Sequence, residues 1–449
     1  MSPQPHETTH DVVIVGAGIM GCALAVAFGN QGRRVLVLER DLSEPDRIVG
    51  ELLQPGGVEA LEKLGMRDCL EDIDAIPVYG YETIYHGEPV TIPYPWTSAG
   101  KKAEGRAFHH GKFVQKLRAA ARRTPNVTLL EATAKDILRD EASLQVLGVL
   151  ATEKSSKTTH TYRGKLTVSA DGYASNFRKR CTTRKPVVRS TFVGLQLIDV
   201  KLPSPNHGHI IMGNNPPVLL YQIGTHETRA LVDMPSLPPS GQLKPYLLEI
   251  VAPDLPAQVQ PAFRKAVEAA DRLPSMPNSF LPAQANDTPG MILLGDAMNM
   301  RHPLTGGGMT VAFNDAYLLS HLLSPSIVPD FADTTAVLEQ MRLFHWDRKS
   351  LSGVVNILAQ ALYALFAADD SRLRVLQMGC FIGHAGQPVG GLDGLRKAGW
   401  TWFQLAGGRQ RRHIHQCARL VRADLVQEHW RVVSHDDVPV VWAGEASRR

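Results

Sequence analysis

Short apolar runs separated by polar, glycine-containing turns mark the start of this chain. Residues 11–15 (DVVIV) and 34–38 (RVLVL) are β-branched runs, typical of strands buried on both faces. Between them, residues 22–28 (CALAVAF) predict a helix that ends near Gly32. The pattern therefore predicts a strand, a helix and a second strand within the first 40 residues.

The same pattern predicts further elements along the chain. Residues 165–169 (KLTVS) and 291–294 (MILL) have the pattern of buried strands, and residues 310–323 predict a helix. Residues 351–368 (LSGVVNILAQALYALFAA) are apolar, but Ser352, Gly353, Asn356 and Gln360 interrupt them. A membrane span needs about 20 apolar residues, so we expect a buried or interfacial helix here.

The first predicted turn contains glycines at the spacing of a dinucleotide-binding motif. Gly16, Gly18 and Gly21 form GxGxxG directly between a strand and a helix. The first glycine permits the tight turn, the second lets a pyrophosphate approach the backbone, and the third lets helix and strand pack closely. Glu39, at the end of the second strand, can accept hydrogen bonds from ribose hydroxyls. The alternative is a glycine-rich turn in an ordinary strand–helix–strand unit.

Two later segments favour FAD over NAD as the dinucleotide. The strand at 165–169 leads into Asp171-Gly172, and the strand at 291–294 leads into Gly295-Asp296. An aspartate there suits the ribityl or pyrophosphate region of a flavin. Residues 305–309 (TGGGM) then let the backbone lie close to a planar ring, because glycine has no Cβ.

Composition narrows the class of protein. The chain has 449 residues, 44% of them hydrophobic and 20% charged, which indicates a folded protein of two or three domains rather than a disordered one. A net charge of +4 is too small for a dedicated nucleic-acid binder. The five cysteines form no CxxC pair, so we expect neither a disulfide framework nor a metal site. The polar N-terminal decapeptide does not have the pattern of a signal peptide.

Together these motifs resemble the squalene epoxidase family of FAD-dependent monooxygenases. The resemblance spans roughly residues 11–391 and rests on the runs RIVGELLQPGG at 47–57, VYGY at 78–81, GRAFHHG at 105–111 and GDAMNMRHPLTGGGMT at 295–310. It implies an α/β, two-domain protein: a Rossmann-type FAD-binding domain of the aromatic-hydroxylase-like flavoprotein fold, a substrate domain with a mixed β-sheet, and a helical C-terminal region.

The resemblance also implies domain boundaries, which the proline-rich joints support. The FAD-binding domain is expected to be discontinuous, the substrate domain to lie between its pieces, and a helical region to follow. The predicted ranges are 11–76, 105–185 and 285–336 for the FAD-binding domain, 77–104 and 186–284 for the substrate domain, and 337–449 for the C-terminal region.

The implied activity is epoxidation of a terminal double bond of squalene, giving 2,3-oxidosqualene through a flavin C4a-hydroperoxide. The protein would supply positioning and an apolar cavity without water. We expect that cavity between the flavin, Tyr81, the strand at 192–200 and the helix at 355–366. The sequence has no second strand–GxGxxG unit for NADPH, so electrons come from transient NADPH binding or, as the resemblance implies, from an NADPH-dependent diflavin reductase. The implied location is the cytosolic face of the endoplasmic reticulum membrane, with peripheral contact.

Site residues follow from the matching motifs. Tyr81 would line the substrate pocket near the flavin, with Gln54 as its hydrogen-bonding neighbour. Some of these residues also have a purely structural interpretation. Arg47 and Arg118 could be surface arginines, and Met309 could belong to the helix core. His109 and His110 could be ordinary loop or helix-start residues. The resemblance assigns FAD binding to Gly16, Gly18, Gly21, Glu39, Arg40, Arg47, Arg118, Asp296, Gly308 and Met309.

The chain departs from the family pattern after Gly391. Apolar residues there recur at helical spacing among arginines, which predicts a basic amphipathic helix formed around Ile414, Ala418, Val421 and Leu425. Such a helix could lie on an anionic bilayer or pack on the protein body. The departure motivates one alternative, an epoxidase of another polyprenyl compound. Likeness of the scaffold leaves two more open: a prenyl-binding chaperone without FAD and a reductase of prenyl double bonds.

Overall fold

The predicted strand–helix–strand unit is present in the structure. β1 (His10–Val15) leads through a glycine turn into α1 (Ile19–Asn30), and β2 (Val35–Glu39) follows. β1 and β2 pair in parallel. Of residues 12–15 and 35–38, all except Val15 are less than 4% exposed. The run of buried β-branched residues thus forms the centre of a sheet. The computed structural model describes residues 9–97, 100–367, 373–375 and 377–378.

The first sheet has six strands and contains both later strands that were predicted. β8 (Val127–Arg139) pairs in parallel with β2, β10 (Thr159–Ser169) with β1, and β16 (Met291–Leu293) with β10. The C-terminal half of β8 and the N-terminal half of β10 pair antiparallel with β9 (Val146–Glu153), which lies between them. The carboxyl ends of β1, β2, β10 and β16 therefore meet at one edge, where ligands bind in open α/β sheets.

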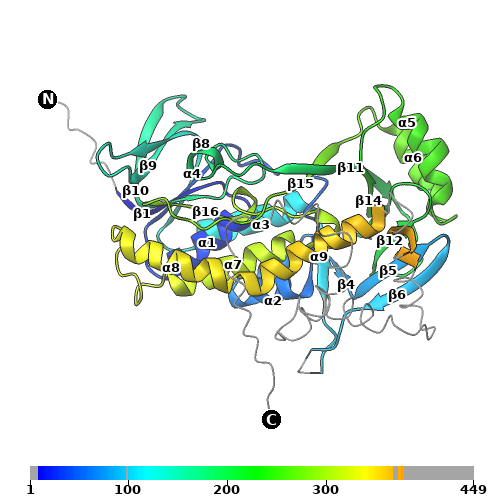
Figure 1. The fold of residues 1–449 in the computed structure, drawn as a ribbon, viewed down its shortest axis with the longest axis horizontal. Helices are drawn as coiled ribbons and strands as arrows, with labels where there is room; N and C mark the ends of the chain where they lie inside the picture. The colour runs from blue at the N-terminus through cyan, green and yellow to red at the C-terminus, as the bar shows by residue number, and fades with distance from the viewer. Residues whose placement is uncertain (1–8, 98–99, 368–372, 376, 379–449) are drawn as a thin grey trace, which may run out of the picture.

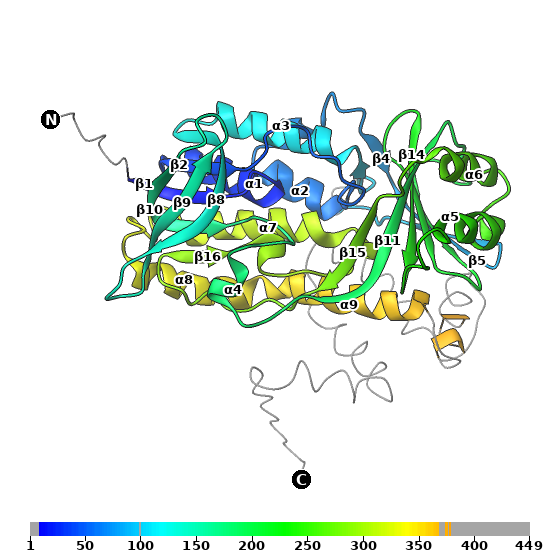
Figure 2. The ribbon, with the colours of Figure 1, turned by 90° about the horizontal axis from the view of Figure 1, so that it is seen from above.

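Helices pack on this sheet and beside one another. α1 contacts α3 (His110–Arg123) and α7 (Gly307–Leu322), and α7 contacts α2 (Pro55–Lys63). Figure 2 shows α3, α1 and α7 running beside the strands. Their apolar side chains and those of the sheet form one core cluster, which includes Phe28 and Phe313. Burial of this surface stabilises the unit at about 25 cal/mol per Å².

The second sheet has seven strands, in the order β15-β11-β14-β13-β12-β5-β6. β5 and β12 are parallel, whereas the other neighbouring strands run antiparallel. It lies at the opposite end of the molecule from β9 (Figure 1). Its strands are β5 (Gly80–Tyr85), β6 (Glu88–Pro93), β11 (Val187–Ile198), β12 (Gly208–Met212), β13 (Val218–Gln222), β14 (Glu227–Met234) and β15 (Ser275–Phe280).

Each face of this second sheet packs against a different layer. Because side chains alternate along a strand, residues next to each other in β11 point to opposite faces. Phe192 packs on the inner face with Tyr81 and Leu304, whereas Val193, Leu195 and Leu197 pack on the outer face with α6 (Gln260–Ala269). Only the inward-facing residues of β11, such as Phe192, therefore lie on the side of Tyr81, and the predicted place of the substrate cavity stays a prediction.

Smaller elements connect the two sheets. β3 (Leu52–Leu53), β7 (Gly105–Ala107) and β4 (Ile76–Val78) form a three-stranded sheet between them. The remaining short helices are α4 (Arg178–Cys181) and α5 (Leu243–Tyr246), with 3-10 turns at Arg67–Leu70, Ala252–Asp254, Gly295–Ala297 and Pro303–Thr305 and a π-helical turn at Leu247–Val251. The predicted domain boundaries stay a prediction.

The C-terminal part of the described chain is helical. α8 (Thr334–Asp347) and α9 (Lys349–Ala367) follow α7, and α9 extends from the first sheet to the second (Figure 1). Among the described residues, α9 is the one helix long and apolar enough to cross a membrane, and 22% of its most apolar window is buried. The basic helix predicted around Ile414 to Leu425 lies outside the described residues.

One predicted helix begins earlier than expected. α7 starts at Gly307 instead of Thr310, so the last two of the three consecutive glycines are helical. Gly306 precedes the helix with a φ of +60°, which favours glycine. A Cβ on Gly307 would lie 2.6 Å from a methyl carbon of Val355. These glycines therefore serve the close packing of α7 and α9 as well as the loop.

Candidate cofactor and substrate site

The three glycines of the GxGxxG turn differ in what surrounds them. A Cβ on Gly16 would lie 2.5 Å from the Ala170 carbonyl oxygen, and one on Gly21 would lie 1.9 Å from the Gly16 oxygen. Around Gly18, by contrast, no atom lies within 4 Å of that position. Gly16 and Gly21 are therefore required by backbone packing, while Gly18 leaves open space at the N-terminus of α1. That arrangement fits an approaching pyrophosphate.

Glu39 and Arg118 support the same turn. The Ala17 N–H donates to Glu39 Oε2 at 2.8 Å, and Arg118 Nε donates to the Ala17 oxygen at 2.9 Å. Arg118 also donates to the Ser43 oxygen at 2.8 Å, and its guanidinium lies 3.7 Å from Glu39 Oε2. The Arg118 side chain is buried, and Arg40, beside Glu39, is exposed. Arg118 and Glu39 thus order the loop that follows β1.

Asp296 lies after β16 at the shared edge of the first sheet. Solvent reaches its side chain, yet desolvation raises the pKa of its carboxyl against the opposing effects of Arg301, Arg47 and Arg178. Arg47 is exposed, and its guanidinium lies 5.6 Å from the centre of the Tyr173 ring. The Asp296 carboxyl is thus surrounded by protein but still open to solvent on one side. Such a position fits contact with a polar ligand.

Arg178 is a site residue that the sequence reasoning missed. Its Nη2 donates to the Asp296 oxygen at 3.0 Å and to the Tyr173 oxygen at 2.8 Å, and its Nε donates to the Ala297 oxygen at 2.9 Å. It therefore ties the segment after Asp171-Gly172 to the Gly295-Asp296 turn. The only signal in the sequence was its place six residues after Gly172, which alone predicts no partner.

Gly308 and Met309, in the first turn of α7, have different surroundings. A Cβ on Gly308 would meet no atom within 4 Å, so this backbone is open to a ligand. Met309, one residue on, is buried and belongs to the core cluster of the first sheet. The open glycine fits a flavin lying against the loop, and the burial of Met309 fits its alternative interpretation as helix core.

Tyr81 and Gln54 meet as predicted, and a second tyrosine joins them. Gln54 Nε2 donates to the Tyr81 hydroxyl at 2.5 Å and to the Thr305 oxygen at 3.1 Å, while the Tyr94 hydroxyl donates to Gln54 Oε1 at 2.6 Å. All three side chains are buried. Burial raises the pKa of Tyr81 to about 12, so its hydroxyl stays protonated at neutral pH.

An apolar cluster surrounds these tyrosines on the inner face of the second sheet. Leu362 and Phe366 of α9 pack against it, which brings the predicted C-terminal helix to Tyr81. A cluster of this kind is apolar and excludes water. Its buried members are Ile48, Leu52, Val78, Tyr81, Tyr94, Ala107, Phe192, Ile210, Met212, Leu219, Tyr221, Ile223, Leu231 and Leu304.

Buried polar contacts join the glycine loop and the segment before β3 to the second sheet. The Glu51 carboxylate accepts two hydrogen bonds of 2.8 Å from the Arg229 guanidinium. His302 is fully buried, with Nε2 lying 2.9 Å from Ser190 Oγ and 3.3 Å from Asp233 Oδ2. Since its Nδ1 accepts from the Leu304 N–H at 3.3 Å, the proton is on Nε2. The sequence predicted neither set of partners.

The two adjacent histidines, His109 and His110, have structural surroundings. His110 is buried, and its Nδ1 donates to the Gly50 oxygen at 2.9 Å. Burial lowers the pKa of His110 to about 4, so the ring is neutral. His109 is half-buried, 3.9 Å from a Glu227 oxygen. Both fit the alternative interpretation as non-catalytic residues.

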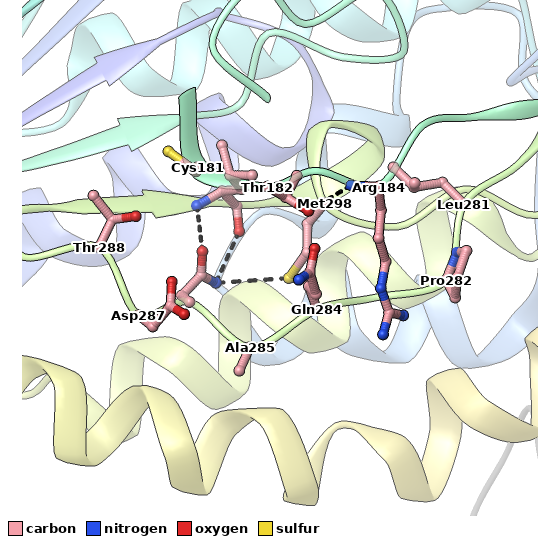
Figure 3. Close-up of a pocket in the computed structure, with 12 residues that line it drawn as sticks. Cys181, Thr182, Arg184, Leu281, Pro282, Gln284, Ala285, Asp287, Thr288 and Met298 are labelled. Carbon is pink, nitrogen blue, oxygen red and sulfur yellow. Dashed lines mark hydrogen bonds between the residues drawn. The ribbon is translucent and has the colours of Figure 1, made fainter. Parts of the chain in front are cut away.

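A small cavity near Cys181 and Met298 is too small for the site (Figure 3). Its volume of about 10 Å³ accommodates one water molecule at most. Beside it, the Asn286 side chain donates to the Leu293 oxygen at 3.1 Å and accepts from the Leu293 N–H at 2.7 Å. The residues around this cavity therefore hold β16 in place and do not form a binding site.

Comparisons with known proteins agree on one family. Residues 163–389 match the family model described as squalene epoxidase. The chain is 58% identical over 395 residues to the squalene epoxidase of Aspergillus fumigatus, which covers 86% of this chain and 82% of that protein. It is 40% identical over 406 residues to the squalene epoxidase of Saccharomyces cerevisiae, covering 83% and 81%. It is 43% identical over 380 residues to the squalene monooxygenase of Mus musculus, covering 84% and 65%.

Solved structures show the same fold at low sequence identity. The p-nitrophenol 4-monooxygenase of Pseudomonas putida superposes with a TM-score of 0.72 at 20% identity, covering 90% of this chain and 100% of that one. The flavin-dependent brominase Bmp2 superposes with a TM-score of 0.64 at 15% identity, covering 92% and 98%. The predicted fold class is therefore confirmed.

Proposed function

Because this chain belongs to the squalene epoxidase family, we propose that it is an FAD-dependent monooxygenase that converts squalene to 2,3-oxidosqualene. One observation of the structure carries the proposal. The GxGxxG turn and the Asp296 turn share an edge of the first sheet, and Thr305 of the glycine loop hydrogen-bonds Gln54, the partner of Tyr81 in the apolar cluster. These contacts support a cofactor site next to a hydrocarbon site.

The residues at this edge fit FAD. The open positions at Gly18 and Gly308 are two places where backbone meets a ligand without a Cβ between them. Glu39 would accept from the adenosine ribose, with Arg40 beside it, and the N–H groups at the start of α1 would bind the pyrophosphate. Asp296 and Arg47 would bind farther along the cofactor, while Arg118 holds the loop and Met309 supports the glycine segment.

The chain's own residues then prepare the reaction. When bound, FAD supplies activated oxygen for transfer to a carbon–carbon double bond. The apolar cluster around Tyr81 excludes water and binds the polyene, at about 25 cal/mol per Å² of apolar surface buried. Tyr81 belongs to this cluster, its hydroxyl accepts from Gln54, and it stays protonated. It would orient the terminal double bond and hold a proton at its phenol oxygen.

The experiment for this function is direct. Purified, flavin-loaded protein is incubated with squalene, NADPH and a microsomal diflavin reductase, and products are identified by mass spectrometry. We expect mono-oxygenated squalene, and we expect Asp296→Ala to abolish it through loss of the flavin absorbance. A yellow protein whose flavin is reduced and reoxidised without product would overturn squalene as the substrate in favour of another polyprenyl compound.

We propose a separate NADPH-dependent diflavin reductase as the electron donor. The support is that the sequence contains one strand–GxGxxG unit, which FAD would occupy, and no second such unit for NADPH. Flavin reduction is followed by absorbance with NADPH alone and with NADPH plus reductase. Reduction at the same rate in both would contradict the need for a reductase.

We also propose peripheral contact with the endoplasmic reticulum membrane through α9. Ile357 of α9 is 66% exposed, and Trp346 at the end of α8 is 57% exposed. Such large apolar side chains on neighbouring helices suit a bilayer surface. Co-sedimentation with phospholipid vesicles tests this: Ile357→Glu should lower the bound fraction, and Leu144→Glu, which changes an exposed leucine between β8 and β9, should not.

A further inference from the structure

The direction of the hydrogen bonds around Gln54 can be assigned from the chemistry of its partners. The Thr305 carbonyl can only accept, so the carboxamide must present Nε2 to it at 3.1 Å. Oε1 then faces the Tyr94 hydroxyl at 2.6 Å, which must donate. The amide therefore has one orientation, and Tyr81 receives the second N–H of Nε2 at 2.5 Å.

We propose that Tyr94 is a positioning residue for the epoxidation, acting on Tyr81 through Gln54. This inference rests on the proposed function and extends it to a residue that the family motifs did not mark. The Tyr94 hydroxyl donates to Gln54 Oε1 and its ring packs on Tyr81, so it holds the amide, whose orientation the Thr305 carbonyl sets, in place against the Tyr81 oxygen.

The surrounding structure leaves Tyr81 little freedom except at its hydroxyl. A Cβ on Gly208 would lie 2.8 Å from the Tyr81 ring, so that strand holds the ring closely. The Tyr94 ring packs edge-on against it, with centroids 6.1 Å apart. Tyr94 itself is held by the β5–β6 hairpin, because its N–H donates to the Tyr79 oxygen at 2.7 Å. Hydrogen bonding then determines where the phenol oxygen of Tyr81 lies relative to the glycine loop.

Removing the Tyr94 hydroxyl would leave a buried amide oxygen without its donor. An unsatisfied buried acceptor is unfavourable, so the amide would rotate or shift to find another partner. A flipped amide would place Oε1 against the Thr305 oxygen, where two acceptors repel. The contacts from Gln54 to Tyr81 and to the glycine loop would therefore loosen together.

The first test is Tyr94→Phe, which keeps the ring and removes the hydroxyl. We expect epoxide formed per NADPH consumed to fall about fivefold, which is the equivalent of about 1 kcal/mol for one buried hydrogen bond, with hydrogen peroxide released instead. The KM for squalene should stay within twofold. The matched control is Tyr79→Phe, in the same hairpin, whose hydroxyl donates to Glu104 at 3.1 Å. Its coupling ratio should be that of the unmodified enzyme.

The second test asks whether Tyr94 acts through Gln54. Tyr94→Phe is combined with Gln54→Met, and the coupling ratio is measured for both single variants and the double variant. If the effects pass through the amide, Tyr94→Phe changes the ratio by less than twofold in the Gln54→Met background. The thermal unfolding midpoints of the flavin-free proteins give a readout without turnover, where the combined shift should be smaller than the sum.

Three outcomes would overturn the proposal: full coupling in Tyr94→Phe, equal loss in Tyr79→Phe, or additive effects of the two substitutions. Each is distinct from failure of the proposed function, which is the absence of epoxide from the unmodified enzyme. Should Tyr94→Phe lose FAD, the flavin-free melting cycle still decides between coupled and additive behaviour.

Discussion

The cofactor half of this protein and the junction between its two sheets are held together in different ways. The first sheet and its helices form an apolar core in which the special positions are glycines, as at Gly16 and Gly21. At the junction, buried charged and polar groups join distant segments, as in Glu51 with Arg229. Apolar packing tolerates small changes, whereas a buried charge depends on one partner. The junction should therefore be the more sensitive region.

The largest expected effect is at the buried ion pair of the junction. Glu51→Ala leaves the Arg229 guanidinium buried without its partner, and we expect the free energy of unfolding to fall by about 3–5 kcal/mol. Urea unfolding measures this. The double variant Glu51→Ala, Arg229→Met should recover part of the loss, because it buries no charge. A double variant less stable than Glu51→Ala would contradict this account.

The next effect separates two glycines of one turn. Gly21→Ala puts a Cβ 1.9 Å from the Gly16 oxygen, and we expect a loss of about 1–3 kcal/mol in the unfolding free energy. Gly18→Ala meets no atom within 4 Å, so the flavin-free protein should keep its unfolding midpoint. FAD binding should weaken at least tenfold in Gly18→Ala, measured by flavin fluorescence titration. Unchanged FAD affinity would place the pyrophosphate elsewhere.

A smaller effect depends on pH and on one buried histidine. Burial lowers the pKa of His110 to about 4 from an ordinary value near 6.5, so the unfolded state binds the proton more tightly. His110 therefore contributes its full stability above pH 6.5 and loses it as pH falls toward 4. At pH 5.5 the loss is about 1 kcal/mol.

The measurement for His110 is the unfolding free energy at several pH values. His110→Gln keeps a donor for the Gly50 oxygen but does not titrate, so its profile should be flatter between pH 6.5 and 4. The remaining slope should include His209, whose pKa burial also lowers to about 4. An identical slope in His110→Gln would rule out this contribution.

The smallest effect is at an exposed ion pair whose nitrogen–oxygen distance equals that of the buried one. Arg67 and Glu71 are joined at 2.8 Å, but their side chains are 33% and 61% exposed. We expect Arg67→Ala to change the unfolding free energy by at most about 0.5 kcal/mol, because water screens the pair. If Arg67→Ala lowered the unfolding free energy as much as Glu51→Ala, the distance between the charges rather than their burial would determine the strength of an ion pair.

The sequence predicted local elements of structure better than contacts between segments that are distant in the chain. The first strands and the helix between them are present within a few residues of their predicted bounds, since each depends on local periodicity. The start of α7 was predicted three residues late, because the packing of Gly307 on Val355 is a contact across 48 positions of the chain. The partners of Arg178 and His302 were not predicted at all.

By itself, the sequence determined the dinucleotide turn, the buried strands and the family, because glycine spacing and apolar runs express short-range requirements of the backbone. Only the tertiary structure decided which half of β11 faces Tyr81, and that Tyr94 completes the contacts of Gln54. The direction of a buried hydrogen bond depends on every donor and acceptor within about 3 Å, and those atoms come from residues far apart in the chain.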